Sequence, residues 1–461
     1  MSLITLTRGL ARSRLRFATV LILLVPNAAP AGETTSTPTG SALSDDVVLQ
    51  GLVKEALEKR PELAQARASV QAEVERVPQA GALPDPVLSL GIQNDGFKAI
   101  QIGKMETSFL SVTASQTFPW YGKRGLRSDV LTLEARRAEA DLGRARLSVR
   151  AEVERGYLDL LLVRDQLKLQ ARLETLWTQA EGSARARYEA GEGAQSDILR
   201  AQLERSRLKQ RRWALTAEER RRVAVLNRLR GHPLDDTLPT DRSLADLADP
   251  VLPDAAQAST EAETQSPELA KARLSVEESG ALVDLAKKDY LPDLTVSAGL
   301  MPRWGAFEWM WQAGLSFSLP VWAGSKQARA VAEGELRGTA AEAGSEAVRQ
   351  LLRQRVAERL GLLAAILETN QLYRSGLLVQ SEATVSSTLA QYQVGRVTFA
   401  SVLESLTGYV GDLNGFYESV AAAHRLAIAQ REVSLDPVDG LATSGMGGSS
   451  VPGVDVSNVG S

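Results

Sequence analysis

The chain has 461 residues, a formal net charge of −3 and only 5% aromatic residues. Ala, Leu, Arg, Glu and Gln dominate its composition, which favours long helices over an aromatic-rich globular core. The near-neutral charge gives no reason to expect a nucleic-acid partner, and the absence of Cys excludes disulfides, thiolate metal sites and Cys nucleophiles.

Residues 1–31 are typical of a secretory signal peptide. Four arginines between Arg8 and Arg16 form a positive region, the apolar run Phe17–Val25 follows, and Ala29-Pro30-Ala31 is a small-x-small cleavage site. The apolar run is shorter than the roughly 20 residues of a spanning helix, which argues against a single membrane anchor. No later stretch is long enough to span as a helix, so any membrane crossing must use strands.

An internal duplication organises the rest of the chain. Four landmarks recur in the same order at shifts of 206, 208, 201 and 204 residues: Pro61-Glu62-Leu63 as Pro267-Glu268-Leu269, Leu83-Pro84-Asp85 as Leu291-Pro292-Asp293, Phe118-Pro119 as Leu319-Pro320, and Tyr188-x-x-Gly191 as Tyr392-x-x-Gly395. We therefore predict a first repeat at 45–230, an inter-repeat linker at 231–259, a second repeat at 260–435 and a disordered tail at 436–461.

Each repeat is predicted to begin with a helix and continue with two strands. The first helix spans about Leu63 to Ala80, because the prolines that follow cannot continue it. Apolar and small polar residues then alternate with a period of two, which predicts strands at about 86–95, 109–118, 294–302 and 308–319. Their lengths suit a tilted bilayer crossing. A soluble antiparallel sheet shows the same alternation, but isolated strand pairs about 200 residues apart, separated by helical sequence, argue against it.

Long helices follow each strand pair. No proline interrupts 125–188, which at 1.5 Å per residue reaches roughly 90 Å, and 327–392 is similar. A heptad-like stripe of apolar residues predicts the packing core: Leu142, Val149, Val153, Tyr157, Leu160 and Leu167. The segments 188–199 and 392–403 are predicted as turns, with Gly191 and Gly395 in the positive-φ conformation of a helix end. Ser196 and Thr398 are expected to N-cap the returning helices.

Four strands are too few to close a membrane barrel, since the smallest bacterial form has 8. In hydrocarbon, each unpaired backbone group at an open sheet edge costs several kcal/mol. Several copies must therefore pool their strands, and the residues alone predict more than one copy.

These features together resemble the TolC, or outer-membrane efflux protein, family over about Asp45 to Leu435. The resemblance rests on the paired Pro-Glu-Leu motifs, the two Tyr-x-x-Gly segments and the prolines at the helix–strand junctions: Pro84, Pro119, Pro292 and Pro320. The stretch Thr117–Arg124 looks most like the heavy-metal efflux branch, CusC- and CzcC-like, as does Tyr290–Asp293 followed by Trp309–Gly314.

The resemblance implies a mainly α fold with a small transmembrane β part. A long α-helical coiled-coil tunnel and four β-strands per protomer would form a homotrimer with a twelve-stranded β-barrel in the outer membrane of a Gram-negative bacterium. The tunnel would project into the periplasm and meet a periplasmic adaptor (membrane fusion) protein and an inner-membrane efflux pump. The duct itself would be passive. We expect heavy-metal cations as its cargo, while export of drugs or organic solutes and type I secretion stay open.

The resemblance also implies roles for residues near the turns. A periplasmic gate would involve Asp197, Tyr392 and Glu404, and Ser401 occupies the position of an acidic family residue. The alternative role of Asp197 is to stabilise a helix N-terminus. The turns that meet the adaptor would include Tyr188, Gly191, Ser196, Gly395, Arg396 and Thr398.

Little in the sequence supports an enzyme. The only two histidines, His232 and His424, have neither a catalytic arrangement nor metal-ligand spacing, so we expect no cofactor and no metal site. The competing hypothesis from another class is a soluble periplasmic coiled-coil scaffold or adaptor. It explains the long helices, but it does not explain four alternating strands.

Overall fold

A computed structural model describes residue 43 and residues 45–437. All of these residues belong to one compact unit. The predicted signal peptide at 1–31 and all but two residues of the predicted tail at 436–461 lie outside the described residues.

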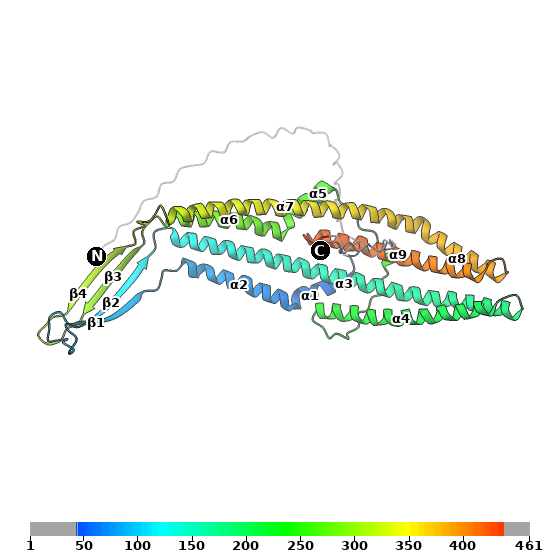
Figure 1. Cartoon of the computed structure of the whole chain (residues 1–461), viewed down its shortest axis with the longest axis horizontal. Helices are drawn as coiled ribbons and strands as arrows, with labels where there is room; N and C mark the ends of the chain where they lie inside the picture. The colour runs from blue at the N-terminus through cyan, green and yellow to red at the C-terminus, as the bar shows by residue number, and fades with distance from the viewer. Residues whose placement is uncertain (1–42, 44, 438–461) are drawn as a thin grey trace, which may run out of the picture. The chain divides into compact units, whose positions relative to one another are not determined.

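The two halves of the chain repeat the same order of elements, in a mainly helical fold with four antiparallel strands (Figure 1). The first half contains α1 (Val47–Lys59), α2 (Pro61–Gly81), β1 (Val87–Gln93), β2 (Phe109–Phe118), α3 (Lys123–Glu189) and α4 (Gln195–Leu229). After the short η1 (Leu244–Asp246), the second half contains α5 (Ala255–Gln265), α6 (Pro267–Lys288), β3 (Leu294–Met301), β4 (Met310–Phe317), α7 (Gln327–Leu372), η2 (Tyr373–Leu377), α8 (Leu378–Gln393) and α9 (Phe399–Glu432). Helix α5 begins inside the stretch predicted as a linker.

The long helix of the second half runs without a gap over 327–393, which confirms the prediction for 327–392, but it contains a π-helical turn that was not predicted. The π-helical turn η2 separates α7 from α8, whereas α3 continues for 67 residues. The extra residue of a π turn redirects the side chains around it. Here Tyr373 packs on Phe416 of α9 with ring centroids 5.9 Å apart, and Arg374 pairs with Asp249. Tertiary contacts of this kind are invisible to helix periodicity.

The helices form a layer four elements wide. Nearest the sheet, the packing order is α2, α3, α6 and α7. Toward the other end, α3 packs between α4 and α9, and α8 packs on the far side of α9. The sheet is also four strands wide, in the order β1-β2-β3-β4. The outer members are thus β1 and β4 in the sheet, α2 and α7 among the helices nearest the sheet, and α4 and α8 at the other end.

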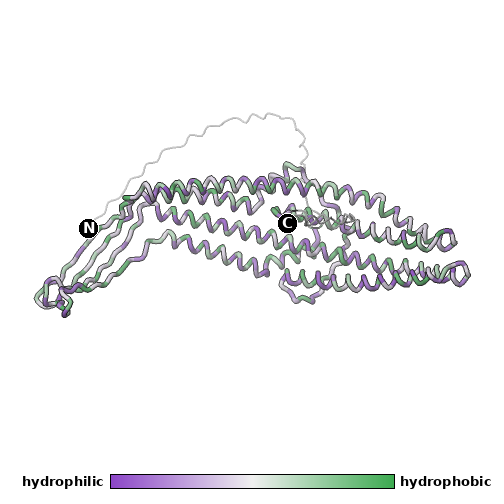
Figure 2. The backbone as a smooth tube through the Cα atoms, in the orientation of Figure 1, coloured by the Kyte–Doolittle hydropathy of each residue, from purple (hydrophilic) through white to green (hydrophobic). Residues whose placement is uncertain are grey.

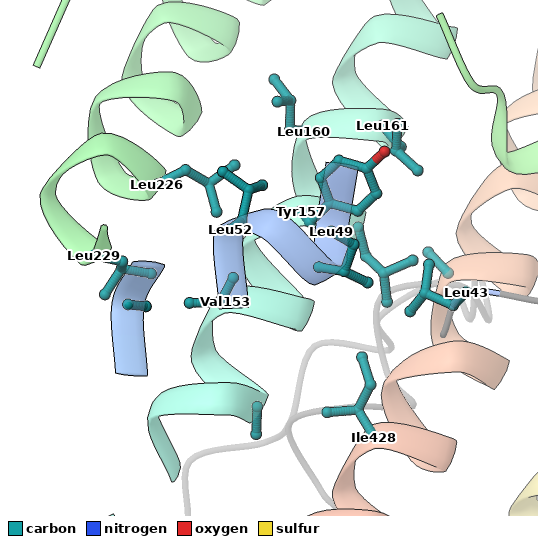
Figure 3. Close-up of a cluster of buried hydrophobic side chains, with 14 of the residues drawn as sticks. Leu43, Leu49, Leu52, Val153, Tyr157, Leu160, Leu161, Leu226, Leu229 and Ile428 are labelled. Atoms are coloured by element: carbon teal, nitrogen blue, oxygen red, sulfur yellow. The ribbon is translucent and has the colours of Figure 1, made fainter. Parts of the chain in front are cut away.

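The main core lies midway along the helices, where α1, α3, α4 and α9 meet (Figure 3). Five of the six residues of the predicted stripe are buried there, and Leu167 is half-buried. The hydroxyl oxygens of Tyr157 and Thr240 lie 3.0 Å apart, and Asp165 accepts the Leu244 N–H over 2.6 Å. These bonds hold the segment between the two halves against α3.

Polar and apolar residues are mixed along the helices (Figure 2). Among the residues that the structure describes, no helix combines the length and the apolarity needed to cross a membrane. Apolar side chains nevertheless remain exposed on the outer helices of the layer: Val74 on α2, Leu203 and Trp213 on α4, Leu336 on α7 and Val379 on α8.

Candidate functional site

Two regions at opposite ends of the helices are candidates for function (Figure 1). One is the four-stranded sheet. The other is formed by two turns, which we call the first turn (residues 188–199, between α3 and α4) and the second turn (residues 392–403, between α8 and α9).

The sheet has one apolar and one polar face. The strand register aligns the residues of each face in rows that cross all four strands. Leu90 pairs with Val112, Val112 with Leu300, and Leu300 with Trp311. Leu90 and Trp311 are 75% and 77% exposed, so the described residues of one chain leave the apolar row uncovered. The polar row on the other face consists of Ser89, Thr113, Gly299 and Gln312.

The polar face has little room. A Cβ on Gly299 would lie 2.8 Å from the Thr113 hydroxyl oxygen, and one on Gly91 would lie 2.6 Å from that of Ser111. Glycine inside a strand commonly marks a tight bend or a close approach. The large side chains of the sheet therefore lie on its apolar face. A sheet that curves around its polar face needs this arrangement, because the inner side of the curve has less room.

The four predicted junction prolines lie in helix–strand connections: Pro84 between α2 and β1, Pro119 between β2 and α3, Pro292 between α6 and β3, and Pro320 between β4 and α7. The structure adds Lys123, which the sequence analysis missed. It is 3% exposed, and its ammonium group donates to the Leu291 carbonyl and to Asp293, each over 2.9 Å. The buried charge thereby ties the junction of the first repeat to that of the second.

The two turns have the same backbone. Gly191 and Gly395 have φ values of 79° and 76°, which confirms the predicted left-handed conformation. The N–H of Glu192 donates to the Arg187 carbonyl over 2.8 Å, and the equivalent N–H of Arg396 donates to the Gln391 carbonyl over 2.9 Å. This pattern closes the end of a helix around a glycine.

One predicted N-cap is wrong. Helix α4 begins at Gln195 with Ala194 as its N-cap, so Ser196 lies inside the first helical turn. Thr398 does occupy the N-cap of α9, but its side chain makes no capping bond and lies 3.4 Å from the Ser401 hydroxyl. The helix begins two residues earlier than the hydroxyl pattern suggests because the glycine-centred turn sets where it starts.

The structure brings together two of the predicted gate residues. Tyr392 is 1% exposed, and its hydroxyl donates to Asp197 over 3.1 Å, joining α8 to the start of α4. Its ring meets Phe399 edge-on, with centroids 5.5 Å apart. Burial, together with the charge of Asp197, raises the pKa of Tyr392 to about 12. The hydroxyl therefore keeps its proton, and the hydrogen bond, at any physiological pH.

Arg187, a residue that the sequence analysis missed, joins the two turns. One guanidinium nitrogen donates to the Tyr392 carbonyl and another to the Glu192 carbonyl, each over 3.1 Å. The guanidinium also lies over the Tyr392 ring, 5.0 Å from its centroid. No local motif marks such a residue, because its partners lie 205 and 5 positions away.

The other predicted residues stay apart from this cluster. Ser401 is half-buried and Glu404 is exposed on α9. The six predicted adaptor-contacting residues are all exposed: Tyr188, Gly191, Ser196, Gly395, Arg396 and Thr398. Between residues 45 and 437, no three His, Cys, Asp or Glu side chains are grouped to hold a metal ion.

A comparison with protein-family models identifies one family. The family model described as outer membrane efflux protein matches residues 52–232 and 258–407. Protein CyaE of Bordetella pertussis is 28% identical over 186 residues, which are 40% of this chain and 39% of CyaE, so the alignment spans well under half of either protein.

Solved structures agree on the fold. A structure of CusC has 16% sequence identity and a TM-score of 0.72, over 88% of this chain and 98% of that one. The outer membrane protein VceC of Vibrio cholerae has 18% identity and a TM-score of 0.70, over 85% and 98%. At these identities the likeness establishes the fold alone.

Proposed function

We propose, from the premise that this chain belongs to the outer membrane efflux protein family, that it is the passive exit duct of a tripartite efflux system. Family and fold are those of channel proteins rather than enzymes. The observation that carries the proposal is the sheet with its uncovered apolar row, placed at the opposite end of the helices from two exposed turns (Figure 1).

The open edges of the chain support a homotrimer. Strands β1 and β4 each have one edge without a partner in the sheet, and unpaired edges are not tolerated in hydrocarbon. Three copies would supply about twelve strands, within the known range of barrels. The exposed Leu203 of α4 and Val379 of α8 would pack between copies in the same way.

The faces of the sheet support an orientation in the outer membrane. The apolar row would meet lipid and the polar row would line the barrel. Trp304, Trp309 and Trp311, at 52%, 66% and 77% exposure, suit the membrane–water interface. The helices would then form a periplasmic tunnel that ends in the two turns.

The turns would serve as gate and docking surface. The Tyr392–Asp197 bond joins α8 to α4 at the gate, and Ser401 and Glu404 on α9 would be further gate residues. The six exposed turn residues named above are available to the periplasmic adaptor, which would link the tunnel to an inner-membrane pump. Both turns present backbone bent at glycine, which lets a partner approach closely.

Heavy-metal cations are the proposed cargo. The support is the stretch Thr117–Arg124, which resembles the metal-exporting branch of the family. Drugs or organic solutes and type I secretion substrates are the alternatives. Deleting the gene and measuring growth across a panel of metal salts, antibiotics and solvents decides between them. Sensitivity confined to antibiotics or solvents would rule out the metal assignment.

Membrane fractionation tests the duct itself. A trimeric channel should appear in the outer-membrane fraction, require detergent for extraction, and migrate as an oligomer that heating dissociates. The soluble scaffold hypothesis predicts recovery from the periplasmic fraction without detergent. A chain that purifies as a soluble monomer would end the channel proposal.

A further inference from the structure

The two repeats of one chain meet at a buried lysine where the sheet joins the helices. Lys123, the first residue of α3, is 3% exposed, and its ammonium group donates to the Leu291 carbonyl and to Asp293, each over 2.9 Å. The N–H of Trp120 donates to the same carboxylate over 2.8 Å. The connection that follows β2 thus binds the connection that precedes β3.

Both halves of this contact recur in the other repeat. The Leu-Pro-Asp motif that ends at Asp293, before β3, recurs before β1, where it ends at Asp85. Lys123 is the first lysine after the proline that follows β2, and Lys326 is the first lysine after Pro320, which follows β4. The second connection is two residues longer, a difference that the flexible four-carbon stem of a lysine can span. Lys326 and Asp85 are therefore the repeat counterparts of a pair that is bound and buried.

These counterparts have no such contact within one chain. Asp85 precedes β1 and Lys326 follows β4, and these are the two edge strands of the sheet (Figure 1). Both residues are exposed. Among the residues that the structure describes, neither side chain forms a salt bridge or a hydrogen bond. Each edge of the chain therefore carries one half of a pair that the middle of the chain holds complete.

Closing the ring of the proposed channel joins the two edges. Within a chain, β2 pairs antiparallel with β3. Strand β4 is the repeat counterpart of β2, and β1 is the counterpart of β3, so β4 of one copy pairs with β1 of the next in the same orientation. The connection after β4 then lies beside the neighbour's connection before β1, as Lys123 lies beside Asp293.

The register of the new strand pair agrees with this placement. The junction proline recurs at a shift of 201 residues, and the Leu-Pro-Asp motif recurs at a shift of 208. Applied to the pairing of β2 with β3, these shifts place Ser316 of one copy opposite Ser89 of the next. The adjacent pair is Leu315 with Leu90, so apolar residues meet apolar ones and small polar residues meet their like. A displacement by one residue would move every apolar side chain of β1 to the polar face.

We propose that Lys326 of each copy binds Asp85 and the Leu83 carbonyl of the neighbouring copy, and that this contact closes the ring where the sheet joins the helices. The inference rests on the proposed trimeric channel. Around the ring, these contacts alternate with the Lys123 contacts, so every boundary between neighbouring repeats is held in the same way. Pairing in another register would cover a lysine and a carboxylate without joining them, which is strongly unfavourable. The contact therefore selects the register as well as the partner.

Crosslinking tests the contact, because the chain has no native Cys. Chains carrying both Asp85→Cys and Lys326→Cys are treated in the membrane with a short bismaleimide and then heated in detergent. We expect covalent trimers, since a link within one chain would have to cross the whole sheet, about 14 Å wide at about 4.8 Å per strand spacing. The controls are each single variant and chains carrying Lys104→Cys with Lys326→Cys, because Lys104 lies in the loop at the far end of the sheet. All controls should stay monomeric.

A second pair of cysteines tests the register. Ser89→Cys and Ser316→Cys are directly opposite in the expected register and should form disulfides between copies under mild oxidation. Ser89→Cys with Ser318→Cys is displaced by two residues on the same face, and it should link severalfold less because diagonal neighbours lie about 7–8 Å apart. A higher yield for the displaced pair would overturn the register.

Exchanging the charges tests the attraction. The fraction of trimers that survives a fixed heating step should fall severalfold in Asp85→Lys and in Lys326→Asp. Chains carrying both changes restore an ion pair and should recover most of the lost fraction. Lys104→Asp reverses another exposed lysine beside the same sheet and should leave the fraction unchanged.

Two further outcomes count against the contact. Trimers in which Asp85→Cys and Lys326→Cys link no more than the controls contradict the placement of the two residues. A double charge variant as labile as the single ones contradicts the ion pair. Failure of the original protein to form heat-dissociable trimers is a different result, because it contradicts the proposed function itself.

Discussion

The first and second turns share a backbone but differ in packing. Tyr188 is 46% exposed, whereas the equivalent Tyr392 is 1% exposed. The second turn places Phe399, 2% exposed, where the first has the polar Gln195. Arg187 reaches across to cover the second turn, while its own equivalent is Gln391. The comparison teaches that glycine and helix ends determine how a turn bends, and that side chains from the other turn determine whether it is packed.

The difference has a dynamic consequence. A segment with few buried contacts opens at low free-energy cost, whereas a packed one opens only with its surroundings. We therefore expect the second turn to be the rigid half of the proposed gate and the first turn to be the adaptable half. The following four predictions test this contrast, beginning with the largest effect.

Replacing Tyr392 by Ala should have the largest effect. Truncating a buried aromatic residue typically costs about 3–5 kcal/mol, here through the lost contact with Phe399 and the emptied space below Arg187. Hydrogen–deuterium exchange at the second turn should accelerate by about 100-fold or more, since 1.4 kcal/mol is a tenfold change. Tyr188→Ala is the control and should change exchange little, within about 0.5 kcal/mol. Equal effects of the two variants would refute the contrast between the turns.

Replacing Arg187 by Gln, the residue at the equivalent position of the second repeat, should loosen both turns. The variant loses two hydrogen bonds from a charged donor and the stacking on Tyr392. A cost of about 2–3 kcal/mol is expected, because hydrogen bonds to charged groups contribute about 1.5–3 kcal/mol. Exchange should rise in both turns at once. Arg185→Gln removes an arginine with a 58% exposed side chain that pairs with Glu181, and it should leave both turns protected.

Replacing either turn glycine by Val should impair export while trimers still assemble. Both positions have positive φ, which costs a side-chain-bearing residue about 1–2 kcal/mol. A Cβ at Gly395 would also lie 3.2 Å from an Arg187 guanidinium nitrogen, whereas one at Gly191 meets nothing within 4 Å. Gly395→Val should therefore reduce resistance more than Gly191→Val does, measured at equal trimer content. Normal resistance in both variants would count against these turns as docking tips.

Replacing Tyr392 by Phe should have the smallest effect, and one that depends on pH. Near neutral pH the variant loses the bond to Asp197, about 1 kcal/mol. The pKa of Tyr392 is about 12 in the folded chain against an ordinary value of 10.0. The unfolded state therefore releases this proton at lower pH than the folded state. The contribution is intact below pH 10 and is lost as the pH rises toward 12.

Melting of the detergent-solubilised trimer at pH 8 and pH 11 checks this sign. The original protein should lose more thermal stability between the two pH values than Tyr392→Phe does. Other alkaline groups titrate equally in both proteins, so the difference between them isolates the buried hydroxyl. A larger alkaline loss in the Phe variant would contradict the assigned direction.

Much of the fold was predictable because the relevant signals are local. The alternation in 109–118 predicted the residues of β2, and the stripe from Leu142 to Leu160 predicted the buried side of α3. The candidate site was predicted less fully. Asp197 and Tyr392 were singled out and lie in contact. Lys123 and Arg187 were missed. Lys123 lies in the stretch Thr117–Arg124, but its partners are 168 and 170 positions away, and Arg187 resembles an ordinary helical cation.

The sequence by itself determined the duplication, the alternating strands, the long helices and the glycine-centred turns. The strands, helices and turns each depend on residues a few positions apart, whose sterics and periodicity act before distant segments of the chain come into contact. Only the tertiary structure decided that Val112 aligns with Leu300 in one apolar row, that the π-helical turn η2 forms inside the second long helix, and that Tyr392 is buried while Tyr188 is not. The row, the π turn and the burial all depend on segments distant in the chain, and such contacts arise only from packing.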